Sequence, residues 1–253
     1  MLVATPTVVT MSSDRGETRR GERIRSTTVR GSTASRRMLA LAHAATDDRP
    51  RGSVVRGAAG SRIARSKPMT TKPSRALVAV IGDGGVSPES PRYLLAEAIG
   101  RGLVDAGHRV VTGGLGGVME AACRGARRSS AWTEGTILGV LPGSDPSAAN
   151  EFVDVALCTG LGHGRNRVVA QADAVIAVGG GAGTLSELAF AWIHGRLVIG
   201  LRCGGWSERL ADERIDERVR YEDLPGDRVY GATTADAALR LLDELLPRYR
   251  RRP

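Results

Sequence analysis

The clearest sequence evidence for the fold is Ala174-Val-Ile-Ala-Val-Gly-Gly-Gly-Ala-Gly-Thr-Leu-Ser-Glu187. Its first five residues are apolar and partly β-branched, which is typical of a strand that is buried on both faces of a sheet. A run of glycines follows at once, and a helical pattern then continues to Gly195. We interpret this stretch as a buried strand, a tight glycine loop and a helix, and we expect the strand, as the most apolar one, to be central in its sheet.

The same sequence of strand, glycine turn and helix recurs along the chain from Arg75 onward. Strands that alternate with helices predict an α/β domain over residues 75–250. We expect one doubly wound, Rossmann-like, mostly parallel sheet with helices on both faces. The apolar runs that predict its strands are 76–81, 109–112, 136–141, 152–157, 174–178 and 197–201. The helices are expected after 87–91, after 117, from about 164, from 184 to 195 and from 234 to 246. The first of them is expected to bury one face that carries Leu94, Leu95, Ala98, Ile99 and Leu103.

Residues 1–74 differ from the rest in composition and charge. They hold 15 of the 36 Lys and Arg residues and 5 of the 27 Asp and Glu residues, and so carry +10. The remaining 21 basic and 22 acidic residues lie in residues 75–253, the body of the chain, and give it a net charge of −1. We predict that residues 1–74 form a disordered basic tail, either a non-native extension upstream of Met69 or a solvated anion-attracting segment. Its Arg and Ser content also allows an organelle transit peptide, but its five acids and the lack of a clear amphipathic helix disfavour one. The nearly neutral body gives no charge-based reason to expect nucleic-acid binding.

Several function classes are disfavoured by what the body lacks. Both lysines, Lys67 and Lys72, lie in the tail, so the body has neither the lysine of a P-loop nor that of a pyridoxal-phosphate enzyme. The three cysteines and four histidines have no metal-ligand spacing, so we expect no metal site. No apolar run approaches the length of about 20 residues that spans a bilayer, and no secretory signal is evident. A cytoplasmic protein without a membrane partner is expected.

Three glycine-rich loops, 82–85, 113–117 and 179–183, follow predicted strands, and such loops meet at one edge of a parallel sheet. Glycine lets backbone N–H groups approach a phosphate, and the dipole of the following helix favours the anion. A tight strand-to-helix turn also favours glycine, so one loop alone would be weak evidence. Together the three loops predict a site for a phosphorylated ligand. The candidate binding residues are Gly82, Gly84, Gly113, Gly114, Gly116, Met119, Gly179, Gly180, Gly181, Ala182, Gly183 and Thr184.

Two side chains near this edge are candidates for chemistry. Thr184 and Glu187 have the spacing of a capping box, but Glu187 could instead point into the pocket. Arg165 is a cation near the start of a predicted helix, where the helix dipole disfavours it. Pairing with Glu187 or with a ligand phosphate would explain this position.

These segments resemble the Lonely Guy (LOG) superfamily over about residues 76–202. Gly179-Gly-Gly-Ala-Gly-Thr-Leu-Ser-Glu187 is similar to its PGGxGTxxE motif, and Gly162-His-Gly-Arg-Asn166 is similar to its MHxRK segment. Thr112-Gly-Gly-Leu-Gly-Gly-Val-Met119 resembles its GGGxxGLMG stretch. The family cleaves the N-glycosidic bond of cytokinin nucleoside 5′-monophosphates. The resemblance places Arg165 and Glu187 at the family's catalytic positions.

Departures from these motifs resemble the molybdenum-cofactor-carrier-like branch of the superfamily, whose members bind a phosphorylated pterin. The departures are Gly179 for Pro, Ser186 for the first of two acids, and Gly162 and Asn166 on either side of His163 to Arg165. Gly204-Gly-Trp206 and the last helix add to this likeness. The older label "lysine decarboxylase" does not suit a body without lysine.

Two functions therefore remain open. The first is a homodimeric binding protein for a nucleotide or the molybdenum cofactor, with no further cofactor required. The second is a phosphoribohydrolase acting on a nucleoside 5′-monophosphate, in which Arg165 orients the substrate and Glu187 activates water or stabilises the sugar cation. Trp192 and its apolar neighbours are candidates for the dimer interface or for the core.

Overall fold

The computed structural model describes residues 75–249. Seven parallel strands form one sheet in the order β4-β3-β2-β1-β5-β6-β7, which confirms the predicted doubly wound α/β fold. The expected tail, residues 1–74, lies outside the described residues. The strands are β1 (Leu77–Gly82), β2 (Arg109–Thr112), β3 (Ile137–Leu141), β4 (Val155–Cys158), β5 (Ala174–Val178), β6 (Leu197–Leu201) and β7 (Val229–Ala232).

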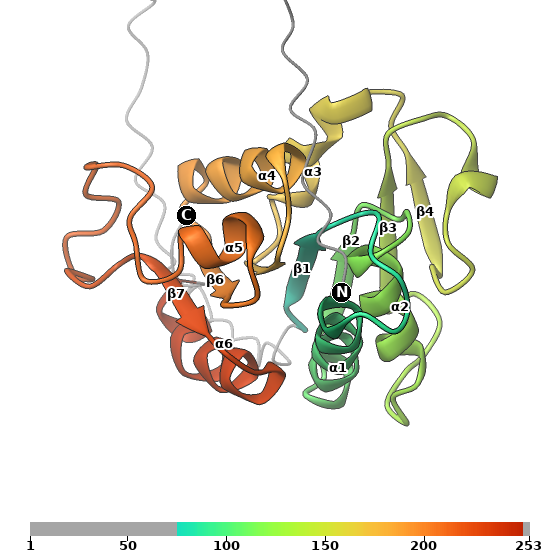
Figure 1. Ribbon diagram of the computed structural model, residues 1–253, viewed down its shortest axis with the longest axis horizontal. Helices are drawn as coiled ribbons and strands as arrows, with labels where there is room; N and C mark the ends of the chain where they lie inside the picture. The colour runs from blue at the N-terminus through green and yellow to red at the C-terminus, as the bar shows by residue number, and fades with distance from the viewer. Residues whose placement is uncertain (1–74, 250–253) are drawn as a thin grey trace, which may run out of the picture. The chain divides into compact units, whose positions relative to one another are not determined.

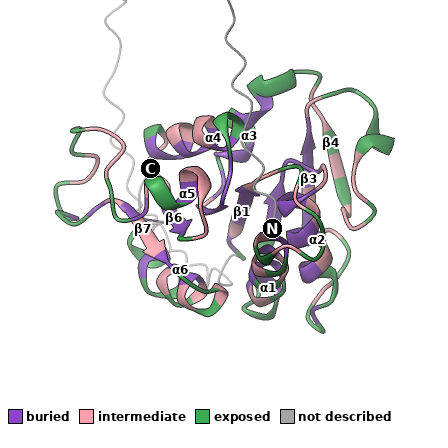
Figure 2. Cartoon of the chain, viewed as in Figure 1, coloured by how far each residue is buried: buried purple, intermediate pink, exposed green. Residues whose placement is uncertain are grey.

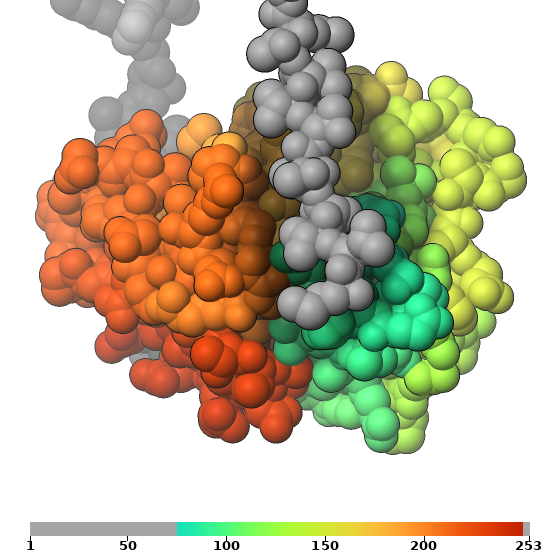
Figure 3. All heavy atoms as spheres, viewed as in Figure 1, coloured from blue at the N-terminus to red at the C-terminus, as the bar shows by residue number. Residues whose placement is uncertain are grey.

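Helices cover both faces of this sheet (Figure 1). One buried cluster joins the sheet to α1, α2 and α6, and a second joins it to α3, α4 and α5. The sheet order places β1 to β4 on one side of the molecule and β5 to β7 on the other, as the colours of Figure 1 show. The space-filling view of Figure 3 shows the same division at the surface, green on one side and orange to red on the other. The helices are α1 (Pro91–Asp105), α2 (Val118–Arg127), α3 (Asn166–Val169), α4 (Ala182–Ile193), α5 (Gly205–Arg209) and α6 (Ala235–Tyr249), with short 3-10 turns η1 (Pro146–Ala148) and η2 (Gly162–Arg165).

The buried strands lie where their apolar runs predicted them. All five residues of β5 and of β6 are buried, because helices cover both faces of these inner strands (Figure 2). β1, rather than β5, is the central strand of the seven. The edge strand β4 differs, since Val155 and Leu157 on one of its faces are exposed.

Three details differ from the sequence prediction. The helix expected from about residue 164 is only four residues long and follows the turn η2. Neither α5 nor β7 was predicted. Helix α1 buries the face that includes Tyr93, Ala96 and Ile99, whereas Leu94, expected on the inner face, is 55% exposed.

Trp192 belongs to the core and not to an exposed interface. Its side chain is 1% exposed, and its indole N–H donates to Asp216 Oδ1 at 2.9 Å. The guanidinium of Arg220 lies over the indole ring, 3.6 Å from its centroid. This contact holds the loop before β7 against the end of α4.

Candidate functional site

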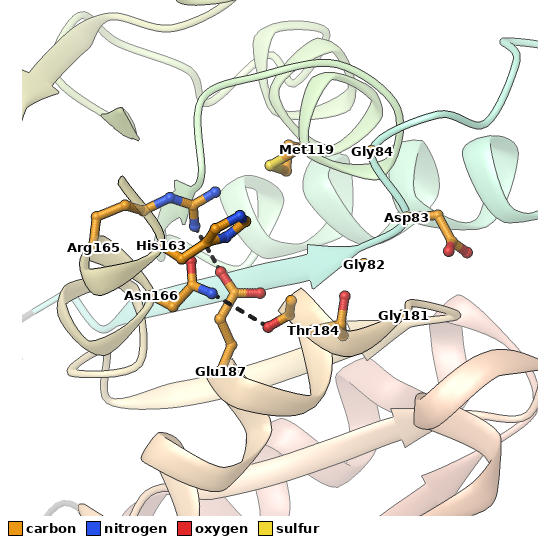
Figure 4. Close-up of a pocket in the computed structure, with 11 residues that line it drawn as sticks. Gly82, Asp83, Gly84, Met119, His163, Arg165, Asn166, Gly181, Thr184 and Glu187 are labelled. Carbon is orange, nitrogen blue, oxygen red and sulfur yellow. Dashed lines mark hydrogen bonds and ion pairs between the residues drawn. The ribbon is translucent and has the colours of Figure 1, made fainter. Parts of the chain in front are cut away.

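A cavity of about 250 Å³ lies at the carboxyl edge of the sheet, where β1, η2 and the start of α4 meet (Figure 4). A parallel sheet binds ligands at this edge. The lining residues are Gly82, Asp83, Gly84, Met119, His163, Arg165, Asn166, Gly181, Gly183, Thr184 and Glu187.

The N-terminus of α4 forms one wall of this cavity. Its N-cap is Gly181, and no side chain caps the helix. A helix leaves its first N–H groups without intrahelical partners, and these groups attract anions. A Cβ added at Gly181 or at Gly183 would meet no heavy atom within 4 Å, so the backbone here is open to the cavity.

The capping box that the sequence allowed is therefore not formed. Glu187 instead accepts a hydrogen bond from Arg165, with 2.7 Å between Nη1 and Oε1. The two residues are 8% and 6% exposed, so this is a buried ion pair that faces the cavity. The buried Nε atom of Arg165 has no hydrogen-bond partner within the described residues 75–249.

Burial has a direct effect on Glu187. Removal from water raises the pKa of its carboxyl from 4.5 to about 7, and the nearby charge of Arg165 offsets only part of this effect. A carboxyl that titrates near neutral pH can take up or release a proton under physiological conditions. The pair could therefore hold an anion, exchange a proton, or do both.

The two substituted motif positions contact each other beside this pair. Asn166 Nδ2 donates to Ser186 Oγ at 2.7 Å, and Ser186 Oγ in turn donates to the Gly183 carbonyl at 2.7 Å. Where the LOG motifs have a lysine and an acid, this chain thus has a neutral hydrogen bond. The bond fastens α3 to the first turn of α4.

The second glycine loop serves the site indirectly. A Cβ at Gly113 would overlap the guanidinium of Arg165, so this glycine leaves room for the arginine. A Cβ at Gly114 would press against Leu141, and neither Gly114 nor Gly116 lines the cavity. From the stretch 112–119, only Met119 reaches the cavity wall.

The third loop is held in place by α5. Gly179 and Gly180 have φ angles of +67° and +97°, which favour glycine. The N–H groups of Trp206 and Ser207 donate to the carbonyls of Gly180 and Gly179, each at 3.0 Å. The buried Ser207 hydroxyl also accepts from the Gly179 N–H at 2.8 Å.

The structure brings together most, but not all, of the predicted site residues. Gly179, Gly180 and Ala182 do not line the cavity, although they shape the loop and the helix start that do. Sequence reasoning missed Asp83, His163 and Asn166, which also line it. The signal for each was its position, directly after a strand or beside Arg165.

Two absences hold for residues 75–249. No group of three or more His, Cys, Asp or Glu side chains is arranged to hold a metal ion. No helix in this part of the chain is long and apolar enough to cross a membrane.

The chain is similar to several solved structures, among them molybdenum cofactor proteins. It is 32% identical to TM1055, covering 67% of this chain and 99% of that one, with a TM-score of 0.57. The molybdenum cofactor binding protein of Rippkaea orientalis is 30% identical, with 69% and 99% coverage and a TM-score of 0.56. The molybdenum cofactor carrier protein of Chlamydomonas reinhardtii is 27% identical, with 69% and 99% coverage and a TM-score of 0.55.

These likenesses confirm the predicted relation to the LOG-like superfamily and its carrier-like branch. The family model of the SLOG cluster4 family matches residues 75–228, which is more than half of the chain. The chain belongs to the SLOG cluster4 family.

Proposed function

We propose that this protein binds a phosphorylated small molecule, a nucleotide or the molybdenum cofactor, with its phosphate on the first turn of α4. The observation that carries this proposal is the uncapped helix start at Gly181, open to a cavity that also contains the buried Arg165. A phosphate would accept hydrogen bonds from the backbone N–H groups of the helix, and the positive charge of Arg165 would attract it. Relatives that bind the molybdenum cofactor support the choice of ligand class.

The direct test is to identify the ligand that the purified protein holds. Native mass spectrometry of the full chain, followed by denaturation, is expected to release a phosphorylated nucleotide or pterin. Calorimetry with AMP and with inorganic phosphate then measures the anion site itself. A protein that binds neither anion and carries no phosphorylated molecule would contradict the proposal.

A second candidate function is hydrolysis of the N-glycosidic bond of a nucleoside 5′-monophosphate. It is favoured by Glu187, whose carboxyl has a pKa of about 7 and lies in the cavity beside Arg165. A group with this pKa could activate water, or stabilise positive charge on the sugar once ionised. A binding protein needs only the anion site, whereas a hydrolase also needs the Glu187 carboxylate to activate water or to stabilise the sugar cation.

The variant Glu187→Gln separates the two functions. The amide is nearly isosteric and can still accept from Arg165, so the fold and the anion site are expected to persist. Affinity for AMP should stay the same or rise, because Arg165 loses its competing carboxylate. If the protein is a hydrolase, adenine release should fall by roughly 10²–10⁴-fold.

Chromatography of adenine from AMP measures this difference. Release by the wild type that is lost in Glu187→Gln establishes the hydrolase. Tight binding without release by either protein favours the carrier. Equal release by both proteins would show that Glu187 has no part in catalysis.

We also propose that the protein is a cytoplasmic homodimer, and that the dimer covers the exposed apolar side chains of the edge strand β4, Val155 and Leu157. Residues 155–164 contain no Asp, Glu, Lys or Arg, and an edge strand without charge is prone to association.

Light scattering at micromolar concentration should give twice the chain mass, and Leu157→Lys should give the monomer. Leu94→Lys, on the equally exposed α1 surface, is the matched control and should remain a dimer. A wild-type monomer would contradict the proposal.

A further inference from the structure

The side chain of Arg92, the second residue of α1, connects loops that leave the sheet in different directions. Strand β1 leads into α1 on one face of the sheet, and its neighbour β5 leads into α4 on the other face. A doubly wound sheet binds its ligands at the point where two such loops diverge. Arg92 lies at this point and joins the two layers of helices.

Arg92 forms a hydrogen bond with a loop on each side of it. Its Nη1 donates to Asp83 Oδ2 at 2.7 Å, in the loop that follows β1. Its Nε donates to the Cys203 carbonyl at 2.7 Å, in the loop that follows β6. The donors of a guanidinium lie in one rigid plane, so these two bonds fix the loops relative to each other and to the start of α1.

Two glycines make room for this side chain. A Cβ at Gly179 would overlap Asp83 Oδ2 and press against Arg92 Cδ, and a Cβ at Gly204 would overlap Arg92 Nη2. Their φ angles are +67° and +85°. Gly179 stands where the LOG motif has a proline, whose ring could not adopt this φ angle, and Gly204 opens the Gly204-Gly-Trp206 segment. Both glycines therefore provide the space that the Asp83–Arg92 pair occupies.

The loop that Arg92 packs against leads directly into the candidate anion site. Gly179 is followed by Gly180 and then by Gly181, the N-cap of α4, which lines the cavity. Arg92 does not line the cavity itself. Its effect on a ligand must therefore pass through the loop after β5 or through Asp83, which lies on the far side of the cavity from Arg165 (Figure 4).

We propose that Arg92 is a positioning residue, which holds the glycine loop after β5 so that the first turn of α4 presents its N–H groups to the cavity in the geometry that a phosphate needs. This inference rests on the proposed function. Arg92 acts by connecting Asp83, Gly179 and Cys203, not by contact with the ligand. A site made of backbone donors loses affinity when its support allows those donors to shift by about half an ångström.

The test measures the affinity of the full chain for AMP and for inorganic phosphate by calorimetry. Arg92→Ala is expected to lower both affinities by about tenfold, because the loop loses its support. Arg92→Lys keeps a donor for Asp83 and should bind within about threefold of the wild type. Gly204→Ala changes no charge and lies outside the cavity, but its Cβ displaces the Arg92 guanidinium, so it should also weaken binding, by at least about threefold.

Arg101→Ala is the matched control, since it removes the same charge from the same helix. Arg101 forms an exposed pair with Asp105 at 3.6 Å, and its loss should leave both affinities as in the wild type. Thermal unfolding identifies a temperature at which every variant is folded, so that a loss of stability alone does not change the measured affinity.

The double variant Arg92→Ala with Asp83→Asn separates positioning from neutralisation of charge. If Arg92 positions the loop, the double variant should still bind about tenfold more weakly than the wild type. If Arg92 only neutralises the Asp83 carboxylate at the cavity wall, the double variant should bind as the wild type does, and the positioning role is wrong.

Two further results would overturn the role of Arg92 while the anion site stands. One is wild-type affinity in Arg92→Ala, and the other is an equal loss of affinity in Arg92→Ala and Arg101→Ala. A wild type that binds neither AMP nor phosphate would instead overturn the anion site, and the inference with it.

Discussion

Gly181→Val is expected to abolish ligand binding while the protein remains folded. Gly181 has a φ angle of −101°, a conformation open to any residue, so the fold itself does not require glycine there. A Cβ at this position would meet no protein atom within 4 Å and would point into open space beside the cavity that Gly181 lines. The branched side chain would occupy the volume in which a phosphate contacts the first turn of α4, and we expect AMP affinity to fall by at least roughly 100-fold.

Calorimetry with AMP and thermal unfolding together check this prediction. Gly143→Val is the matched control, because Gly143 is exposed and a Cβ there also meets no atom within 4 Å, but it lies outside the cavity. The control should bind AMP as the wild type does. Normal AMP binding by Gly181→Val would show that the phosphate does not rest on this helix start.

Much of the fold could be predicted from the sequence because its central strands are buried on both faces. The continuous apolar runs of β1, β5 and β6 report that burial directly. β7 and α5 were not predictable in the same way. β7 is only four residues long and contains Gly231, and α5 begins with a glycine at a φ of +66°. Such short elements form because the surrounding structure holds them, not because of a local pattern.

The site was predictable in its parts but not in its contacts. The sequence left Glu187 with two partners, and burial beside Arg165 decided between them. The glycine loops looked alike, yet the open space lies at Gly181 and Gly183, whereas Gly113 leaves room for the Arg165 guanidinium. This difference depends on which side chains from other parts of the chain pack against each loop, and the spacing of the glycines does not predict that packing.

Arg165→Ala is expected to cause the largest loss of stability among these variants. The side chains of Arg165 and Glu187 are 10% and 8% exposed, so removing the arginine leaves a buried carboxylate without its partner. The loss of one member of a buried ion pair typically costs about 3–5 kcal/mol of unfolding free energy. AMP affinity should also fall, by roughly 1.5–3 kcal/mol, because a charge-assisted contact is lost.

The loss of stability should depend on pH with a definite sign. The folded-state pKa of Glu187 is about 7, above its unfolded value of 4.5, so the folded protein binds more protons between these values and its stability falls as pH rises through that window. Arg165 lowers this pKa, so its removal raises the pKa further. Arg165→Ala should therefore be mildly destabilised near pH 5, where Glu187 is protonated, and strongly destabilised above pH 8, where the unpaired charge must be buried or the carboxyl must remain protonated at a cost.

Urea unfolding of the wild type and of Arg165→Ala at the two pH values measures this difference. Adding Glu187→Gln to Arg165→Ala should restore part of the stability at the higher pH, because no buried charge remains. Arg101→Ala is the control: Arg101 forms an exposed pair with Asp105, and its loss should cost less than about 1 kcal/mol at either pH. An equal loss for Arg165→Ala at both pH values, with no recovery in the double variant, would show that packing of the arginine, rather than its charge, stabilises the site.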